Sequence, residues 1–250
     1  MRYPVNGKKK VAIVTGASRG IGKAIAIRLA ESGADIAVLA RTYDELNTVS
    51  SRIQEIGCKS MVLTGDVTKY SRIAELFTEV YQAFGSIDIL VNNAGINSRK
   101  GLEMLDECDW DTEIDTNLKG VFICCKAAAE FMKKQGRGWI INISSVKGKE
   151  ATTSMSYGAS KAGVIGLSRS LAKQLIPFNI YVNCVAPGFI NTGMSRLLSP
   201  SEVERYLREI PIGRMGEPED IAEVVCFLAS PAASYIVGAT INVNGGYLMD

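Results

Sequence analysis

Short runs of apolar, mostly β-branched residues alternate along the whole chain with longer stretches of helical spacing. Each run is apolar throughout rather than alternating, as expected for a strand that is covered on both faces. Several of the longer stretches end at a glycine, which is a common helix C-cap. The runs predict strands at 11–14, 35–40, 60–63, 87–91, 139–143, 180–185 and 240–243. The stretches predict helices at 23–30, 44–56, 73–84, most of 102–135, 157–175, 200–209 and 218–229.

This alternation predicts one α/β domain over 1–250, a doubly wound Rossmann fold with a parallel seven-stranded sheet and helices on both faces. In such folds ligands bind beyond the carboxyl ends of the strands. The sequence places its unusual segments directly after predicted strands, so we expect them to meet at one edge of the sheet. These segments are 16–22, Asp66, 92–95, 144–145 and 187–188.

A glycine-rich turn, Thr-Gly-Ala-Ser-Arg-Gly-Ile-Gly at 15–22, lies between the first strand and the first helix. Glycines let the backbone turn sharply and approach a ligand closely. The N-terminus of the following helix offers unpaired N–H groups to a phosphate. The turn therefore predicts a dinucleotide pyrophosphate site, although a glycine-rich turn alone also occurs as a simple connection between packed elements.

Composition narrows the possible partners and chemistry. The net charge of +2 gives no strong field for nucleic acid or an anionic membrane. No apolar run is long enough to span a bilayer, and residues 1–10 do not resemble a signal peptide. The six cysteines are interpreted as reduced thiols, which favours a cytoplasmic protein. Histidine is absent, which excludes histidine acid–base chemistry, and no metal site is expected.

Tyr157 and Lys161 lie one helical turn apart, so the phenol and the ammonium can meet the same ligand. A free tyrosine has a pKa of about 10 and is a poor acid or base at neutral pH. We expect the nearby ammonium to lower that pKa, because it stabilises the phenolate. The alternative is a pair of solvated surface side chains, which is common at this spacing.

Taken together, these motifs make the chain resemble the short-chain dehydrogenase/reductase family over essentially its whole length. The glycine turn, Asn-Asn-Ala-Gly at 92–95 and Pro-Gly at 187–188 match the family's pattern in order. The resemblance implies that Tyr157 exchanges a proton with a ketone or alcohol oxygen, and that Lys161 lowers its pKa and holds the nicotinamide ribose. It also implies that Ser145 hydrogen-bonds the substrate oxygen and that Asn117 positions a water linking Lys161 to solvent.

The choice between Ser144 and Ser145 depends on the alignment. The family's usual spacing from serine to tyrosine would select Ser144, whereas alignment on the strand at 140–143 selects Ser145 and leaves the next loop one residue short. Strand geometry is harder to shift than loop length, so Ser145 is preferred. Ser144 is expected to hydrogen-bond the backbone at the strand end.

Two arginines bear on the choice of cofactor. An acidic residue at the end of the second strand would favour NAD, but the chain has Arg41 there and Arg19 in the glycine turn. Two guanidinium groups suit a ribose 2′-phosphate, so NADP(H) is predicted, the alternative being two solvated arginines. Asp44 is expected to be the N-cap of the next helix. The expected cofactor-binding residues are Gly16, Ser18, Arg19, Gly20, Ile21, Gly22, Arg41, Asp66, Val67, Asn93, Ala94, Gly95, Tyr157, Lys161, Pro187, Gly188, Ile190 and Thr192.

The segments 188–194 and 214–222 most resemble those of bacterial 3-oxoacyl-[acyl-carrier-protein] reductases. This resemblance implies reduction of a ketone on an acyl thioester and docking of an acidic acyl carrier protein, to which Lys133, Lys134 and Arg137 would contribute. Phe178, however, stands where those enzymes usually have an arginine. The alternatives are an NADP(H)-dependent enzyme for a free small ketone, sugar, polyol or steroid-like alcohol, and a non-catalytic NADP-binding regulatory protein.

The resemblance also gives expectations for the substrate region and the assembly. Residues 189–215 are expected to act as a substrate lid. A homotetramer is expected to form through about 110–135, 157–175 and 236–250. The apolar residues expected in the lid are Phe189, Ile190, Met194, Leu197 and Leu198.

Overall fold

The computed structural model describes residues 9–193, 195 and 199–250. Seven parallel strands form one sheet in the order β3-β2-β1-β4-β5-β6-β7, which confirms the predicted fold. The strand order reverses between β1 and β4, and such a reversal opens a crevice at the carboxyl ends of the strands. The strands are β1 Val11–Thr15, β2 Asp35–Ala40, β3 Ser60–Thr64, β4 Ile89–Asn92, β5 Gly138–Ile143, β6 Ile180–Pro187 and β7 Thr240–Val243.

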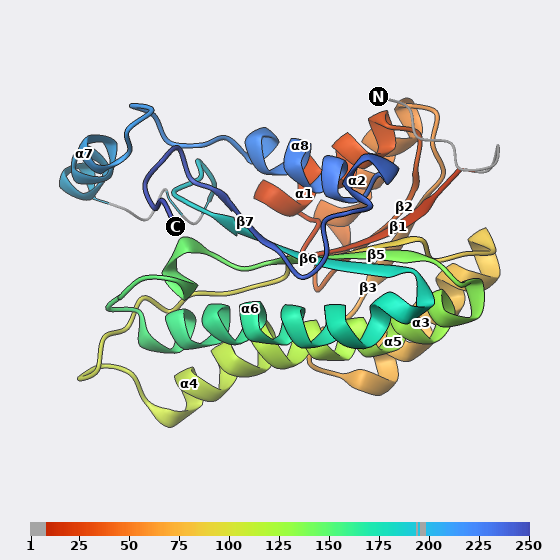
Figure 1. The fold of residues 1–250 in the computed structure, drawn as a ribbon, viewed down its shortest axis with the longest axis horizontal. Helices are drawn as coiled ribbons and strands as arrows, with labels where there is room; N and C mark the ends of the chain where they lie inside the picture. Colours follow the sequence, from red (N-terminus) through yellow and green to blue (C-terminus); the bar gives the residue numbers. More distant parts are fainter. Residues whose placement is uncertain (1–8, 194, 196–198) are drawn as a thin grey trace.

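Helices cover both faces of the sheet (Figure 1). On one face lie α1 Gly20–Glu31, α2 Tyr43–Glu55 and α8 Pro218–Leu228. On the other lie α3 Tyr70–Phe84, α4 Glu107–Ile114, α5 Gly120–Gln135 and α6 Met155–Leu175. The helix α7 Pro200–Glu209 projects from the end of the sheet at which the strands finish. Among the described residues no helix combines the length and the apolar character needed to cross a membrane.

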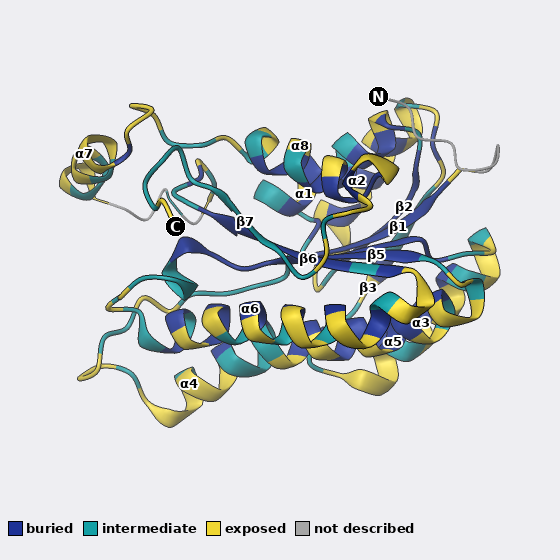
Figure 2. Cartoon of the chain, viewed as in Figure 1, coloured by how far each residue is buried: buried dark blue, intermediate teal, exposed yellow. Residues whose placement is uncertain are grey.

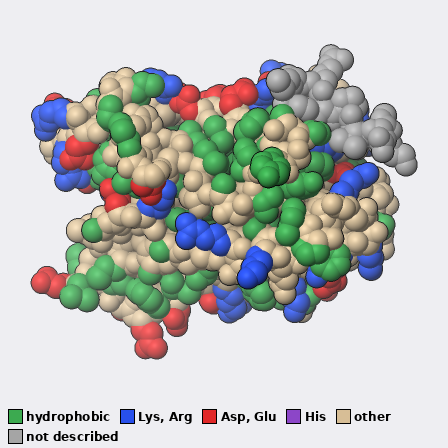
Figure 3. Space-filling view, in the orientation of Figure 1, with side chains coloured by type: hydrophobic (Ala, Val, Ile, Leu, Met, Phe, Trp, Pro, Cys, Tyr) green, Lys and Arg blue, Asp and Glu red, His purple; other side chains and the backbone are tan. Residues whose placement is uncertain are grey.

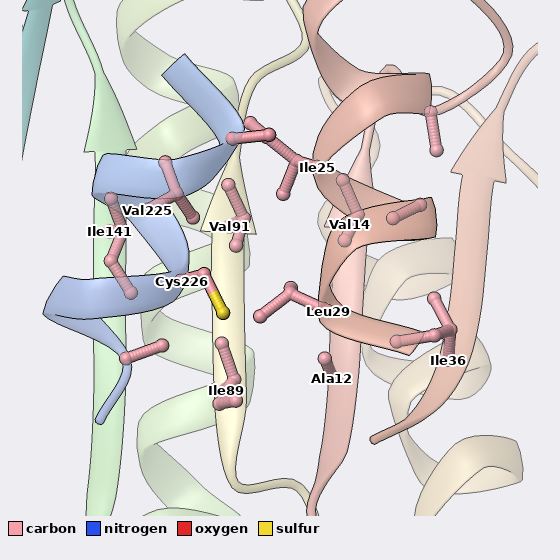
Figure 4. Packing of buried hydrophobic residues seen from close by; sticks show 14 of the residues in the cluster. Ala12, Val14, Ile25, Leu29, Ile36, Ile89, Val91, Ile141, Val225 and Cys226 are labelled. Atoms are coloured by element: carbon pink, nitrogen blue, oxygen red, sulfur yellow. The ribbon is translucent and has the colours of Figure 1, made fainter. Parts of the chain in front are cut away.

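The core has two halves, one on each side of the sheet. Figure 4 shows the first half, where Ile25 and Leu29 of α1 and Val225 of α8 pack against residues of the central strands. The second half packs α3, α5 and α6 against the opposite face. The strands β1, β2, β4, β5 and β6 are buried along almost their whole length (Figure 2), which explains why they are apolar throughout rather than alternating. The edge strands β3 and β7 are mostly half-buried.

Three local differences from the sequence prediction have tertiary or capping causes. The strand β4 begins at Ile89, because the backbone N–H of Ile87 is bound by the side chain of Gln135. Asp44 is not an N-cap, because α2 begins at Tyr43 and Thr42 occupies the cap position. The helices of 102–135 are joined without a loop, because a π-helical segment, Asp115–Lys119, links α4 to α5.

Candidate active site

The turns after β1 and β4 are hydrogen-bonded into one unit. The Thr15 hydroxyl oxygen accepts hydrogen bonds from the backbone N–H groups of Asn93 and Ala94, both at 3.0 Å. The Asn93 side chain in turn donates to the carbonyl oxygens of Thr15 and Gly16, both at 3.1 Å. These four bonds fix the glycine turn against 93–95 at the point where the strand order reverses.

The glycine turn is too tight to admit side chains at two of its glycines. Gly16 has a φ of +63°, and a Cβ there would lie 2.8 Å from the Ala94 Cα. A Cβ at Gly22 would overlap the carbonyl oxygen of Gly16. Helix α1 then begins with Arg19 as an extended N-cap whose side chain makes no capping bond, and its first turn contains no acidic residue. Ser18, Gly20 and Ile21 complete this cradle, which fits a dinucleotide diphosphate.

The expected ribose and adenine residues follow β2 and β3. Arg41 is exposed directly after β2, and Arg19 is exposed in the glycine turn. Asp66 follows β3, where burial raises the pKa of its carboxyl. The Thr68 hydrogen bonds and the charges of Arg41 and Lys69 outweigh burial and lower that pKa overall. Arg41 therefore lies within electrostatic reach of Asp66.

The remaining expected cofactor residues close the same edge of the sheet. Gly188 is packed so tightly that a Cβ there would lie 2.8 Å from the Asn244 Cα. A Cβ at Gly20 would lie 3.4 Å from Thr192, so the segment after β6 meets the glycine turn. Val67 packs against Gly120 at the start of α5. Pro187 ends β6, and Ile190 is buried in the core beside α8 rather than lining a pocket.

Asn117 lies in the π-helical segment and is fully buried. Its side chain accepts from the Ile96 N–H at 2.8 Å and donates to the Ile96 carbonyl at 2.9 Å. A further bond of 3.1 Å runs from its amide to the Ser160 hydroxyl on α6. Asn117 thus connects α6 to the segment that follows β4.

Lys161 is 4% exposed, and its ammonium donates to the Ile143 carbonyl at the end of β5, at 2.9 Å. Burial lowers the pKa of this lysine to about 8. A Cβ at Gly95 would lie 3.4 Å from the Lys161 Nζ and 3.2 Å from the Asn117 Oδ1. The side chains of Asn117 and Lys161 therefore border the same space beside Gly95.

Tyr157 lies in the first turn of α6, with the Ser145 side chain nearby. Burial raises the pKa of Tyr157, the nearby Ser145 side chain lowers it, and the charge of Glu113 raises it further. The expectation that Lys161 lowers this pKa is wrong for the protein without cofactor. The ammonium lies 5.7 Å from the Tyr157 ring centroid and is directed at the Ile143 carbonyl instead.

Ser144 has a different partner from Ser145. Its hydroxyl donates to the Lys161 carbonyl oxygen at 2.7 Å, which ties α6 to the end of β5. Ser145 is also buried and lies near Tyr157, and its hydroxyl accepts the Lys147 N–H at 3.1 Å. Of the two serines, Ser145 is therefore the one with its hydroxyl at the tyrosine.

A group of aromatic and charged side chains, of which the sequence analysis identified only Phe189, lies beside Ser145. Phe189 stacks on Tyr206 of α7 with ring centroids 3.5 Å apart, and Tyr247 meets it edge-on at 5.1 Å. The Lys147 ammonium lies 5.1 Å from the Phe189 ring and 2.6 Å from the Glu150 carboxylate. For Lys147, the only indication in the sequence was its position two residues after Ser145. Met194, Leu197 and Leu198 of the expected lid lie outside the described residues.

Two hollows lie at the end of the molecule where the strands finish and α7 projects. Figure 3 shows one between the lobe that contains α7 and the lobe that contains α4. A second, of about 440 Å³, lies between α7 and 213–217 and is lined by Val203, Leu207 and Met215 among others. The expected substrate region thus lies next to open space.

The basic residues expected to dock a carrier protein lie elsewhere. Lys133, near the C-terminal end of α5, has its ammonium 4.8 Å from the Phe178 ring. Arg137 is paired with the buried Asp88 at 3.0 Å. Tyr157 lies in the first turn of α6, whereas Phe178 follows the far end of that helix. The basic group and the candidate active site of one chain are therefore at opposite ends of α6.

Comparison with known proteins identifies the family. Residues 16–248 match the family model described as Enoyl-(Acyl carrier protein) reductase. The chain is 46% identical to the 3-oxoacyl-[acyl-carrier-protein] reductase FabG of Staphylococcus epidermidis, covering 96% of this chain and 99% of that protein. It is 42% identical to the FabG of Aquifex aeolicus, covering 95% and 96%. The chain belongs to the short-chain dehydrogenase/reductase family.

A solved structure agrees with this assignment. A short-chain type dehydrogenase/reductase from Mycobacterium marinum superposes with a TM-score of 0.93 at 38% identity, covering 96% of each chain. Membership of the short-chain dehydrogenase/reductase family makes this chain an oxidoreductase for CH–OH and C=O groups that uses a nicotinamide cofactor. The alternative of a non-catalytic regulatory protein is thereby set aside.

Proposed function

We propose that this enzyme is an NADP(H)-dependent 3-oxoacyl-[acyl-carrier-protein] reductase, which converts the ketone of an acyl thioester to a secondary alcohol. The observation that carries the proposal is the convergence of four side chains: Ser145 lies near enough to Tyr157 to lower its pKa, and Asn117 and Lys161 border the same space beside Gly95. The relatives named FabG, which match nearly the whole chain, support this substrate class.

In the proposed reaction Tyr157 donates its phenolic proton to the ketone oxygen. Ser145 hydrogen-bonds that oxygen as negative charge develops on it, which stabilises the transition state. A bound nicotinamide dinucleotide supplies the hydride for the carbonyl carbon. Lys161 holds the ribose of that cofactor, and its charge then favours loss of the Tyr157 proton. Asn117 holds the water through which the proton of Tyr157 is replaced.

The preference for NADPH over NADH is attributed to Arg19 and Arg41. Both guanidinium groups are exposed at the edge of the sheet, one in the glycine turn and one directly after β2. A 2′-phosphate between them would accept charge-assisted hydrogen bonds from planar donors. The effect of Arg41 on the pKa of Asp66 supports its orientation toward the adenosine end of the site.

A homotetramer and a cytoplasmic location belong to the same proposal. Exposed apolar side chains lie on α5, at Phe122, and from the end of α8 onward, at Phe227, Tyr235 and Val237. Such surfaces are typical of contacts between copies. All six cysteines are free thiols, as expected in a reducing compartment.

Phe178 favours a second candidate, a reductase of free small ketones. It is exposed where the resemblance leads us to expect a carrier-docking arginine, and the nearby Lys133 ammonium is engaged with its ring. The two candidates share the chemistry of Tyr157 and differ in whether a thioester carrier is recognised.

The test is NADPH oxidation with acetoacetyl-carrier protein, acetoacetyl-CoA, a panel of small ketones and an enoyl thioester. The proposal expects the two acetoacetyl thioesters to be the fastest, with a secondary alcohol as the product. Turnover of free ketones alone would favour the second candidate. Turnover of the enoyl thioester alone would contradict both, because it would place reduction at a carbon–carbon double bond.

A further inference from the structure

Glu113 is a carboxylate buried in the wall of the candidate active site. Its side chain is on α4, directly before the π-helical segment that carries Asn117, and it is only 1% exposed. One oxygen accepts a 2.6 Å hydrogen bond from the Ser156 hydroxyl, and the other accepts the backbone N–H of Ser98. Burying a carboxylate is energetically costly unless it is hydrogen-bonded, and these two donors stabilise Glu113 in its buried position.

The two donors come from segments that border the reacting groups. Ser156 directly precedes Tyr157 in the first turn of α6, and Ser98 lies just after the Ile96 that Asn117 holds. Glu113 therefore joins α4, α6 and the segment after β4. Both donors are neutral, so the negative charge of the carboxylate is not cancelled by them.

Among the charged groups around Tyr157, Glu113 is the one whose charge acts most strongly on the phenol. Its charge is the one that raises the pKa of Tyr157, in addition to burial. A carboxylate near a phenol disfavours the phenolate, because the two negative charges repel each other. Lys161 is directed at the Ile143 carbonyl, beside Cys184 of β6. Of the other charged groups on adjoining segments, Lys147 is paired with Glu150 and Lys100 with Asp109, whereas Glu107 and Asp111 of α4 are exposed.

We propose that Glu113 is a positioning residue which fixes the first turn of α6 and uses its buried charge to keep Tyr157 in the neutral, proton-donating form. This role rests on the proposed function of Tyr157 as the proton donor. The consequence is a wider pH range for reduction, since the phenol has to be protonated at the start of the step. The pH above which reduction fails is therefore set partly by a residue that does not touch the substrate.

The test removes the charge and keeps the shape. In Glu113→Gln the amide oxygen can accept from the Ser98 N–H and the amide nitrogen can donate to the Ser156 hydroxyl. The titration of Tyr157 is then followed by NMR in cofactor-free protein labelled at the tyrosine Cζ. The chain contains 9 tyrosines, so the signal is assigned by its loss in Tyr157→Phe. We expect the midpoint to fall, because the negative charge that disfavours the phenolate is removed.

A matched control carries the same substitution on the same helix. Glu107 is on the exposed side of α4, and Glu107→Gln should leave the Tyr157 midpoint where it is in the unaltered protein. The second readout is the alkaline limb of kcat/KM for ketone reduction. It should move to lower pH by the same amount in Glu113→Gln and not in Glu107→Gln.

Each outcome decides one question. An unmoved midpoint in folded Glu113→Gln, or an equal shift in Glu107→Gln, overturns the role of Glu113. A lowered midpoint in an enzyme that reduces no ketone supports the charge effect and overturns the proposed function instead. If Glu113→Gln does not fold, the double variant Glu113→Leu/Ser156→Ala replaces the carboxylate and its hydroxyl donor with apolar groups, which folded proteins tolerate better than the loss of one partner alone. Only the backbone N–H of Ser98 then loses its acceptor. The same fall is expected there, and an unmoved midpoint overturns the proposal.

Discussion

At the scale of single residues, the adjacent serines after β5 provide a matched pair of substitutions. The Ser145 side chain lies near Tyr157, whereas the Ser144 hydroxyl donates to the Lys161 carbonyl. Ser145→Ala should lower kcat about a hundredfold, because a donor to the developing negative charge is lost. Ser144→Ala should instead lower the free energy of unfolding by about 1 kcal/mol, since it removes a buried hydrogen bond to the Lys161 carbonyl. Steady-state kinetics and urea unfolding measure the two effects, and the reverse pattern would select Ser144 as the catalytic serine.

Substitution of Arg41 tests the choice between NADPH and NADH. Arg41→Ala should raise the Kd for NADPH about tenfold, which corresponds to the loss of one exposed charge pair with the 2′-phosphate. The Kd for NADH should stay nearly constant, because that cofactor has no such phosphate. Arg52→Ala is the control, since Arg52 is an exposed arginine of α2 that is paired with Glu55 at 2.8 Å. Fluorescence titration gives all of these constants, and an equal loss for both cofactors would argue against a 2′-phosphate contact.

Some residues could not be identified from the sequence because burial depends on tertiary packing. Glu113 lies in the acidic stretch 106–115, where a charged helix residue is normally solvated, yet it is buried by the first turn of α6 and the segment after β4. The direction of the Tyr157 pKa shift was missed for a related reason. The i, i+4 spacing places Lys161 on the same face, but it does not reveal the Ile143 carbonyl that receives the ammonium.

At the scale of elements, α7 is held near the site through side chains rather than through the sheet. Lys147→Met should weaken this attachment, because the cation beside the stacked Phe189 and Tyr206 rings and the pair with Glu150 are both lost. We expect KM for the acyl substrate to rise about tenfold, while kcat changes little because Tyr157 and Ser145 keep their places.

Lys126→Met is the control for that substitution. Lys126 makes a comparable contact with the Tyr70 ring, 4.8 Å away, between α5 and α3 and outside the site. Its loss should leave KM unchanged. A fall in kcat with constant KM in Lys147→Met would show that Lys147 acts on the chemical step and not on α7.

The elements themselves were largely predictable. The strand at 240–243 and the helix at 200–209 have the predicted bounds, because apolar runs and the Ser199–Glu202 capping box are local signals. The exceptions depend on distant groups. The late start of β4 comes from Gln135, and the π-helical segment that turns Asn117 toward Ile96 has no periodic signature of its own.

At the scale of the whole molecule, the parallel sheet brings together segments that are far apart in the sequence. The reversal of strand order between β1 and β4 joins the glycine turn to 93–95, and the ends of β5 and β6 bring Ser145 and Thr192 to the same edge. Alternating strands and helices predicted this convergence. The separation of the basic group at Lys133 from Tyr157 follows from the length of α6, and the motifs gave no sign of it.

The most direct measurement compares the unaltered enzyme with Tyr157→Phe in NADPH-dependent reduction of an acetoacetyl thioester, with NADPH affinity measured in parallel. Loss of the proton donor should lower kcat by about 10²–10⁴-fold, the usual contribution of general acid catalysis. The Kd for NADPH should change little, because the phenol hydroxyl is the only group removed. Reduction by Tyr157→Phe at a rate close to that of the unaltered enzyme would contradict the assignment of Tyr157 as the proton donor.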